Sequence, residues 1–220
     1  MNFDTAKYLG GATSRAKSDV ANKLVSMFLH ELSRRISAQF GVGVNDPAYI
    51  KAVADRFGGS CAYCERTLEH DRAAVEHLDG MNRYRVGLHI AGNVILSCKR
   101  CNSEKRRDDS LKELMLAGSG WESFLAHDGK RCAAGCKTCE YWRTLWPDDV
   151  ERSQRLSAAG NRIREFRARF PKAVACCDSA RRDLRESLGS LYRECQEFAA
   201  DKITGAVGQA IDRIISTTKD

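Results

Sequence analysis

Apolar residues recur at three- and four-residue intervals through residues 20–40, which is the spacing of one face of an α-helix. We expect an amphipathic helix there, with Ser18 capping its start and Gly41 ending it. A second, shorter helix is expected over residues 47–57, because proline suits the first helical turn and a glycine pair follows.

The helical period disappears between residues 60 and 110, where short strand-like stretches alternate with glycine and asparagine. The pattern predicts strands over residues 73–78 and 83–90. A helix is then expected to begin near Asn93 and to run past Lys105. The central unit is therefore predicted to contain strand, loop, strand and helix.

Helical periodicity returns after residue 148 and predicts two or three helices that pack on each other or on a partner subunit. The fold class expected for the whole chain is α+β and mostly helical. Its expected parts are an N-terminal helical region (1–58), a central unit (59–110), a cysteine- and tryptophan-rich segment (111–147) and a C-terminal helical region (148–220).

Composition narrows the class of protein. Of the 220 residues 43% are hydrophobic, which supports a packed core and excludes wholesale disorder. There is no apolar run of about 18 residues and no secretory h-region at the start, so we expect a cytoplasmic protein without a transmembrane helix. The net charge of +7 suits a polyanionic partner, although a solvated basic surface explains it equally well.

Ten cysteines are unusual for a cytoplasmic chain, where clustered cysteines favour metal over disulfides. Two C-x-x-C pairs stand out: Cys61, Cys64, Cys98 and Cys101. Together they can give one zinc ion four thiolate ligands, and such a closed site is structural rather than catalytic. The alternative is two unrelated pairs of buried thiols.

A looser group lies in the third segment and consists of Cys132, Cys136 and Cys139. We expect a second zinc site there, with His127 as the candidate fourth ligand. Cys176 or Cys177 could reach back instead, and three free buried thiols are the remaining alternative. The three tryptophans of the chain are more typical of a core than of platforms for stacked bases.

Two short motifs accompany the first cysteine group. Glu76 and His77 stand between the C-x-x-C pairs, and Asn102 directly follows the last cysteine. With these motifs, residues 61–105 resemble the HNH endonuclease family in its four-cysteine, zinc-bound branch. The pattern of that family is C-x-x-C, an acidic residue and His, then Asn-x-x-x-x-Cys-x-x-Cys-Asn-x-x-Lys. This chain has CAYC, EH, NVILSC and CKRCNSEK.

The resemblance implies a ββα-metal core and a role for each motif residue. It makes His77 the general base, Asn93 the brace of the loop that carries the base, and Asn102 a ligand of a catalytic Mg²⁺ or Mn²⁺. Glu76 stands where the family usually has Asp as the other metal ligand. Two departures put that ligand in question: Glu76 is one methylene longer than Asp, and the usual Pro after His is absent. Asp79 is a reserve ligand.

Basic residues cluster around Asn102, and we expect some of them to reach phosphates: Lys99, Arg100, Lys105, Arg106 and Arg107. A solvated helix face is the alternative. His89 could touch a phosphate or the metal, although a plain strand histidine is the simpler interpretation.

By analogy with the family, we expect hydrolysis of DNA phosphodiester bonds to a 5′-phosphate and a 3′-hydroxyl, in a restriction or defence role. Double-stranded DNA is the expected partner. A homodimer formed through the C-terminal helices would bring two active sites to opposite strands. The rival interpretations are a non-catalytic zinc-ribbon protein that binds nucleic acid and a structural protein that recruits partners.

Overall fold

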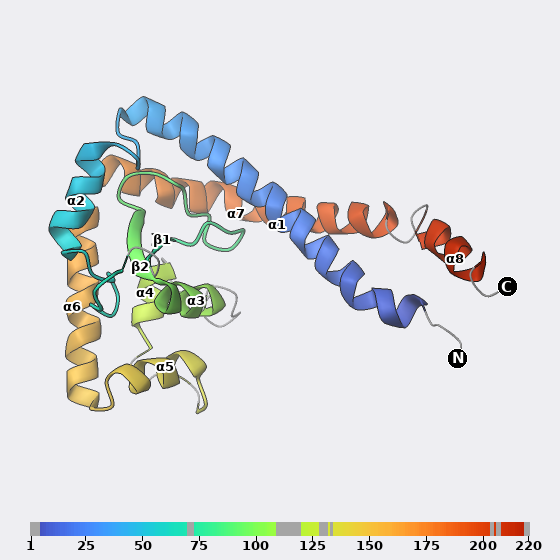
Figure 1. Cartoon of the computed structure of the whole chain (residues 1–220). Helices are drawn as coiled ribbons and strands as arrows, with labels where there is room; N and C mark the ends of the chain where they lie inside the picture. The colour runs from blue at the N-terminus through green and yellow to red at the C-terminus, as the bar shows by residue number, and fades with distance from the viewer. Residues whose placement is uncertain are drawn as a thin grey trace. The chain divides into compact units, whose positions relative to one another are not determined.

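The computed structural model describes residues 5–69, 73–108, 120–127, 132, 134–202, 205 and 208–217. The chain divides into two compact units, residues 1–28 with 186–220 and residues 29–185. In chain order the elements are α1 (Thr5–Phe40), α2 (Pro47–Phe57), β1 (Ala73–His77), β2 (Val94–Cys98), α3 (Lys99–Asp108), α4 (Gly120–Leu125), α5 (Lys137–Leu145), α6 (Asp149–Arg167), α7 (Pro171–Lys202) and α8 (Gly208–Thr217). Figure 1 shows their arrangement within each unit.

The predicted fold class, α+β and mostly helical, is confirmed at this level. Strands β1 and β2 pair antiparallel, from Ala73 opposite Cys98 to His77 opposite Val94. Helix α3 begins at Lys99, directly after β2. The hairpin and the helix therefore follow one another without a linker, and the second C-x-x-C pair spans their junction.

The second strand and the start of this helix were predicted wrongly. Residues 83–90 form turns and irregular backbone, and the strand is β2 (Val94–Cys98), in the place where we expected helix. Val86 and Leu88 are fully buried, so the apolar alternation of this loop reflects burial and not strand pairing. Val86 also has a φ of 51°, a left-handed conformation that interrupts a strand.

The N-terminal helices follow their local signals in part. Helix α1 begins at Thr5 and passes through Ser18, which is therefore not its cap, whereas Gly41 ends it with a φ of 65°. Helix α2 has the predicted bounds. Its C-cap is Gly58, with a φ of 58° and a backbone N–H that donates to Ala54. The described residues after 148 form three helices, α6, α7 and α8, where two or three were expected.

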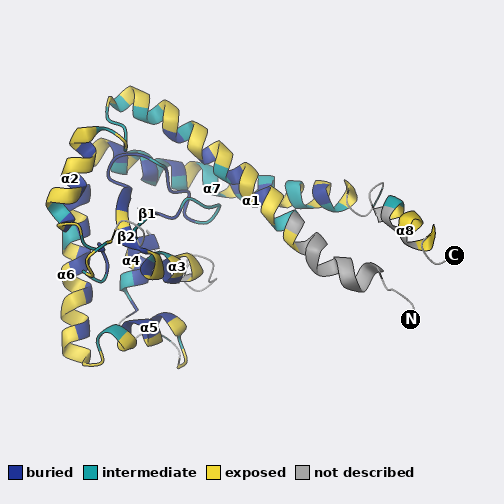
Figure 2. Ribbon diagram, in the orientation of Figure 1, coloured by how far each residue is buried: buried dark blue, intermediate teal, exposed yellow. Residues whose placement is uncertain are grey.

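The core of the unit formed by residues 29–185 contains buried side chains from its hairpin and from several helices (Figure 2). Tyr49 from α2, Ile95 from β2, Trp142 from α5 and Phe166 from α6 are buried in one apolar cluster. Each such side chain stabilises the fold by about 1.5–3 kcal/mol relative to full exposure. This cluster fixes the hairpin against the helices. Within the described residues, no helix is long and apolar enough to cross a membrane.

Candidate active site and metal centres

The first cysteine group is brought together at the junction of hairpin and helix. The sulfur atoms of Cys61, Cys64, Cys98 and Cys101 all lie within 4.8 Å of one another. The Sγ atoms of Cys64 and Cys98 are 3.8 Å apart. A tetrahedron with zinc–sulfur bonds of about 2.3 Å separates its sulfurs by about 3.8 Å. The group could therefore hold a zinc ion with little rearrangement.

Backbone geometry explains how the two C-x-x-C pairs meet. In the first pair, the N–H of Glu65 donates to the carbonyl of Cys61, and Glu65 itself has a φ of 60°. In the second pair, the N–H of Cys101 points to the Cys98 sulfur at 3.4 Å, in the first turn of α3. Without a metal, hydrogen bonds among the four thiols lower the pKa of Cys98 and Cys64 and raise that of Cys61 and Cys101. The thiols thus share protons, and a bound cation would favour the thiolate form of all four.

The second group also comes together, with His127 as its fourth member. The Nδ1 atom of His127 lies 3.1 Å from the sulfur of Cys132, 3.3 Å from that of Cys136 and 3.9 Å from that of Cys139. Tetrahedral zinc places a nitrogen and a sulfur ligand about 3.6 Å apart. This group could hold a second zinc ion, and its fourth member is His127 rather than Cys176 or Cys177.

His77, the expected base, stands half-buried at the end of β1. Its Nε2 atom lies 2.9 Å from Nδ1 of His89. Burial lowers the pKa of His77 to about 3, and the neighbouring His89 and Lys105 add to this effect. The imidazole is therefore neutral at pH 7, which is the form that can accept a proton.

Asn93 lies where a brace of the loop after His77 would be. Its Oδ1 atom accepts from the backbone N–H of Asp79 at 2.8 Å, and its Nδ2 atom donates to the carbonyls of Leu88 and Asp79 at 2.7 and 3.2 Å. The side chain is buried, so these bonds hold in a water-poor environment. One amide thus ties the loop after β1 to the start of β2.

Glu76 points away from His77, because neighbouring residues of a strand face opposite sides. Its side chain is 2% exposed, and Oε1 lies 2.9 Å from Nζ of Lys105 and 3.2 Å from the hydroxyl of Tyr63. Lys105 is 1% exposed and also donates to the backbone carbonyl of His77 at 2.9 Å. The structure therefore does not bring Glu76 and the His77 imidazole to one side. Lys105, expected at a phosphate, instead lies in the interior.

The reserve ligand Asp79 is also engaged. It is fully buried, and its Oδ2 atom lies 3.0 Å from Arg167 and 3.1 Å from Arg181. These two arginines come from α6 and α7, so the carboxylate links the loop after His77 to the helices behind it. Its environment is that of a structural ion pair.

Asn102 is half-buried in the first turn of α3, directly after Cys101 of the four-cysteine group. It precedes Lys105 by three residues, and residues at this spacing share a helix face. Since Lys105 contacts the backbone of His77, this face of α3 is the one turned toward β1. Lys105 also pairs with the carboxylate of Glu76, so this helix face turns to the side of β1 that carries Glu76, whereas the His77 imidazole points to the other side.

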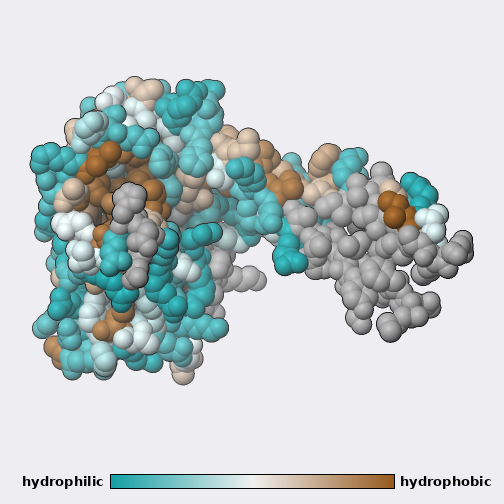
Figure 3. Space-filling view, viewed as in Figure 1, coloured by the Kyte–Doolittle hydropathy of each residue, from teal (hydrophilic) through white to brown (hydrophobic). Residues whose placement is uncertain are grey.

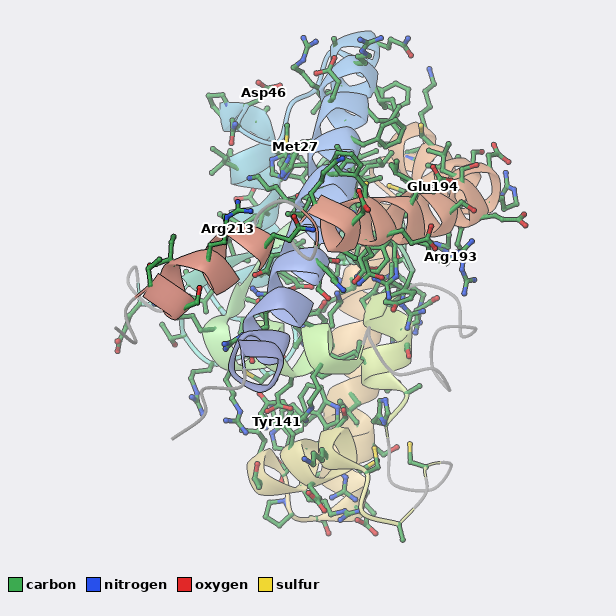
Figure 4. All side chains as sticks on the ribbon, turned by 90° about the vertical axis from the view of Figure 1, so that its right-hand side faces the viewer. Met27, Asp46, Tyr141, Arg193, Glu194 and Arg213 are labelled. Atoms are coloured by element: carbon green, nitrogen blue, oxygen red, sulfur yellow. The ribbon has the colours of Figure 1, made fainter. Side chains whose placement is uncertain are left out.

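Four of the five basic residues expected at phosphates are exposed on α3: Lys99, Arg100, Arg106 and Arg107. Arg100 and Arg107 both pair with the buried carboxylate of Glu104. The guanidinium carbon of Arg100 also lies 5.5 Å from the ring centre of Tyr141 on α5. Figure 4 labels Tyr141. The guanidinium groups are thus held in place while their outer edges face solvent.

A third histidine, His30 on α1, was not identified from the sequence. Its ring centre lies 5.7 Å from that of His89, which is 5.2 Å from that of His77. One turn later on α1, the hydroxyl of Ser33 accepts from the backbone N–H of His89 at 2.8 Å. No local pattern in the sequence signals this contact, because it joins two distant segments.

Together these residues offer a neutral imidazole, an amide on the helix next to the four-cysteine group, and exposed cations on the same helix. A neutral imidazole can take a proton from water, and exposed cations can hold a phosphate. Comparisons of the chain with protein-family models, with curated proteins and with solved structures give no match, so a function must be argued from the residues themselves.

Proposed function

We propose that this chain is a metal-dependent endonuclease of the HNH type that hydrolyses phosphodiester bonds of double-stranded DNA. The observation that carries the proposal is the placement of His77. Its neutral imidazole ends β1, and helix α3, which contacts β1 through Lys105, carries Asn102 next to the four-cysteine group. By analogy with the family it resembles, we propose a restriction or defence role.

The proposed chemistry begins with His77 taking a proton from water. The oxygen of that water attacks phosphorus, and the bond to the 3′-oxygen breaks, which leaves a 5′-phosphate and a 3′-hydroxyl. A base with a pKa of about 3 is weak in the free protein. A bound phosphate brings a negative charge that favours the protonated imidazole, so the substrate itself raises the pKa of His77 toward the working pH.

A hard divalent cation, Mg²⁺ or Mn²⁺, would neutralise charge on the phosphate and the leaving oxygen when bound. The amide oxygen of Asn102 suits such an ion, as do phosphate oxygens and water. Glu76 could join only if its carboxylate left Lys105. We therefore place Asn102 ahead of Glu76 as the protein ligand. The exposed cations of α3 would hold the DNA backbone beside it.

The test uses the zinc-loaded chain, supercoiled plasmid and Mg²⁺ or Mn²⁺. We expect nicked or linear plasmid. Cleavage should stop when EDTA is added and resume when Mg²⁺ is supplied in excess. His77→Ala should cut at least about 10²-fold more slowly, which is the lower range for losing a general base. A Lys51→Ala variant, changed at an exposed position on α2, is the matched control and should cut at the wild-type rate.

The second candidate is a zinc-ribbon protein that binds nucleic acid without cutting it. One observation favours it: the only carboxylate of the E-H motif is engaged in the pair with Lys105 and does not face His77. On this alternative the wild type shifts DNA in a gel and never cleaves it, with either metal. His77→Ala would then bind as the wild type does.

We also propose a homodimer through the terminal helices of the unit formed by residues 1–28 and 186–220. Val20, Leu24 and Met27 on α1 and Phe198 on α7 line a groove of about 670 Å³, and Met27 and Phe198 are 56% and 64% exposed. Figure 4 labels Met27 on α1, and Figure 3 shows hydrophobic residues in brown among hydrophilic ones in teal. Its rim carries both signs of charge, Lys23 with Asp19 and Glu194, so a second copy could pair with it across a two-fold axis. Light scattering should give twice the chain mass, and Met27→Lys with Phe198→Lys should give the monomer.

A further inference from the structure

The pair of His77 and His89 has a geometry that constrains the hydrogen atoms. Nε2 of His77 lies 2.9 Å from Nδ1 of His89, a normal hydrogen-bond distance. At this distance one of the two nitrogens carries a hydrogen and the other accepts it.

Only one of these two arrangements leaves His77 able to act as a base. If Nδ1–H of His89 donated, the remaining hydrogen of His77 would sit on its own Nδ1, and neither nitrogen could take a proton from water. If Nε2–H of His77 donates, Nδ1 of His77 keeps a free lone pair. We propose that His89 is a positioning residue whose Nδ1 accepts from Nε2–H of His77 and thereby reserves Nδ1 of His77 for the attacking water. This inference rests on the proposed nuclease function.

The backbone around His89 is built to hold this pair. Asn93 donates to the carbonyl of Leu88, one residue before His89, and binds both backbone groups of Asp79, two residues after His77. The same buried amide therefore fixes the two histidine-bearing segments to each other. From the other side, the hydroxyl of Ser33 accepts from the N–H of His89 and itself donates to the carbonyl of Leu29.

The proton count follows directly. Water gives one proton to Nδ1 of His77 as its oxygen bonds to phosphorus, and the bond from phosphorus to the 3′-oxygen breaks. The imidazolium that results is a stronger donor than the neutral ring, so its Nε2–H bond to His89 strengthens as charge develops. Solvent then takes the proton from Nδ1, and the 3′-oxygen gains a proton from water. His89 stays the acceptor of this bond throughout and touches neither substrate nor reacting atoms.

Two variants test whether His89 acts as a hydrogen-bond acceptor or only fills space. His89→Asn retains an oxygen that can accept from His77, whereas His89→Leu retains bulk and removes the acceptor. We expect His89→Leu to lower kcat on the order of 10²-fold with KM unchanged, and His89→Asn to recover a large part of that loss. In the full-length wild type, the ¹⁵N chemical shifts of the His77 ring should show that Nε2 is protonated and that Nδ1 is not. In His89→Leu they should show a mixture of both tautomers.

The outcomes are distinguishable. A wild type that never cuts DNA contradicts the nuclease proposal, while the ¹⁵N tautomer measurement still decides the arrangement of the pair. If the wild type cuts and His89→Leu matches it, the positioning role is wrong. Equal losses in the Leu and Asn variants, or hydrogen on Nδ1 of His77 in the wild type, would also overturn it.

Discussion

The ion pair between Glu76 and Lys105 gives a prediction that bears on both stability and mechanism. The two side chains are 2% and 1% exposed, and their charged atoms are 2.9 Å apart. Replacing Lys105 by Met keeps the length of the side chain and removes its charge. The carboxylate of Glu76 would then stay in the core beside the hydroxyl of Tyr63, but without the ammonium group of Lys105.

The burial of the pair sets how much Lys105→Met should lower the free energy of unfolding. Breaking a buried pair by removing one partner costs about 3–5 kcal/mol, because an uncompensated charge stays in the interior. Lys105 also donates to the His77 carbonyl, and losing that bond adds about 1 kcal/mol. Domains of this kind have unfolding free energies of about 5–15 kcal/mol, so the loss is a large part of the total. The double variant Glu76→Gln with Lys105→Met should recover about half of it.

The assay is urea unfolding of the zinc-loaded protein, followed by circular dichroism, for both single variants and the double variant. Lys99→Met, an exposed position on the same helix, is the matched control and should change the free energy of unfolding by less than about 0.5 kcal/mol. If Lys105→Met lowers the free energy of unfolding no more than Lys99→Met does, Glu76 and Lys105 do not form a buried ion pair. Glu76 could then act as a metal ligand. The same Glu76→Gln protein should also retain metal-dependent cleavage if Asn102 is the main ligand.

Three further predictions follow from single features of the structure. Metal analysis should find two zinc ions per chain, with Cys98→Ser and Cys136→Ser each leaving one, whereas Cys195→Ser should leave both. Because the pKa of His77 is 6.5 when exposed and about 3 in the fold, its contribution to stability is complete above pH 6.5 and is lost as the pH falls toward 3. The free energy of unfolding of the wild type should thus fall by about 2 kcal/mol more than that of His77→Asn between pH 7 and pH 5, and parallel curves would contradict this. Gly87→Ala should destabilise the fold by more than about 3 kcal/mol, because its Cβ would lie 1.6 Å from the Asp79 carbonyl, whereas Gly58→Ala meets no atom within 4 Å and should cost only about 1 kcal/mol for its positive φ.

Features with local signals were predictable from the sequence. Helix α2 has the predicted bounds because Pro47 and Gly58 act within one turn of its ends. The two metal groups could be predicted because cysteine spacing largely fixes which sulfurs can share an ion. His127 joined its group as expected, since the short segment to Cys132 leaves the imidazole within reach.

Features that depend on distant contacts were not predictable. Strand β2 exists because it pairs with β1, and the alternation in residues 83–90 imitated a strand while Val86 and Leu88 were filling a core. The charge of Lys105 suggested a surface, but the buried carboxylate of Glu76 draws it inward. The approach of His30 and Ser33 to His89 depends on how α1 docks. None of these contacts has a signature at the residues themselves.

The central claim is that His77 activates water beside a DNA phosphate, and end-group analysis of the products tests it most directly. Wild-type protein and His77→Asn, matched for zinc content and DNA affinity, are incubated with plasmid and Mn²⁺, and the ends are assayed for ligation. The account predicts ends with a 5′-phosphate and a 3′-hydroxyl that ligase reseals, formed at least about 10²-fold faster by the wild type. Intact plasmid with the wild type, or equal cutting by both proteins, would contradict it.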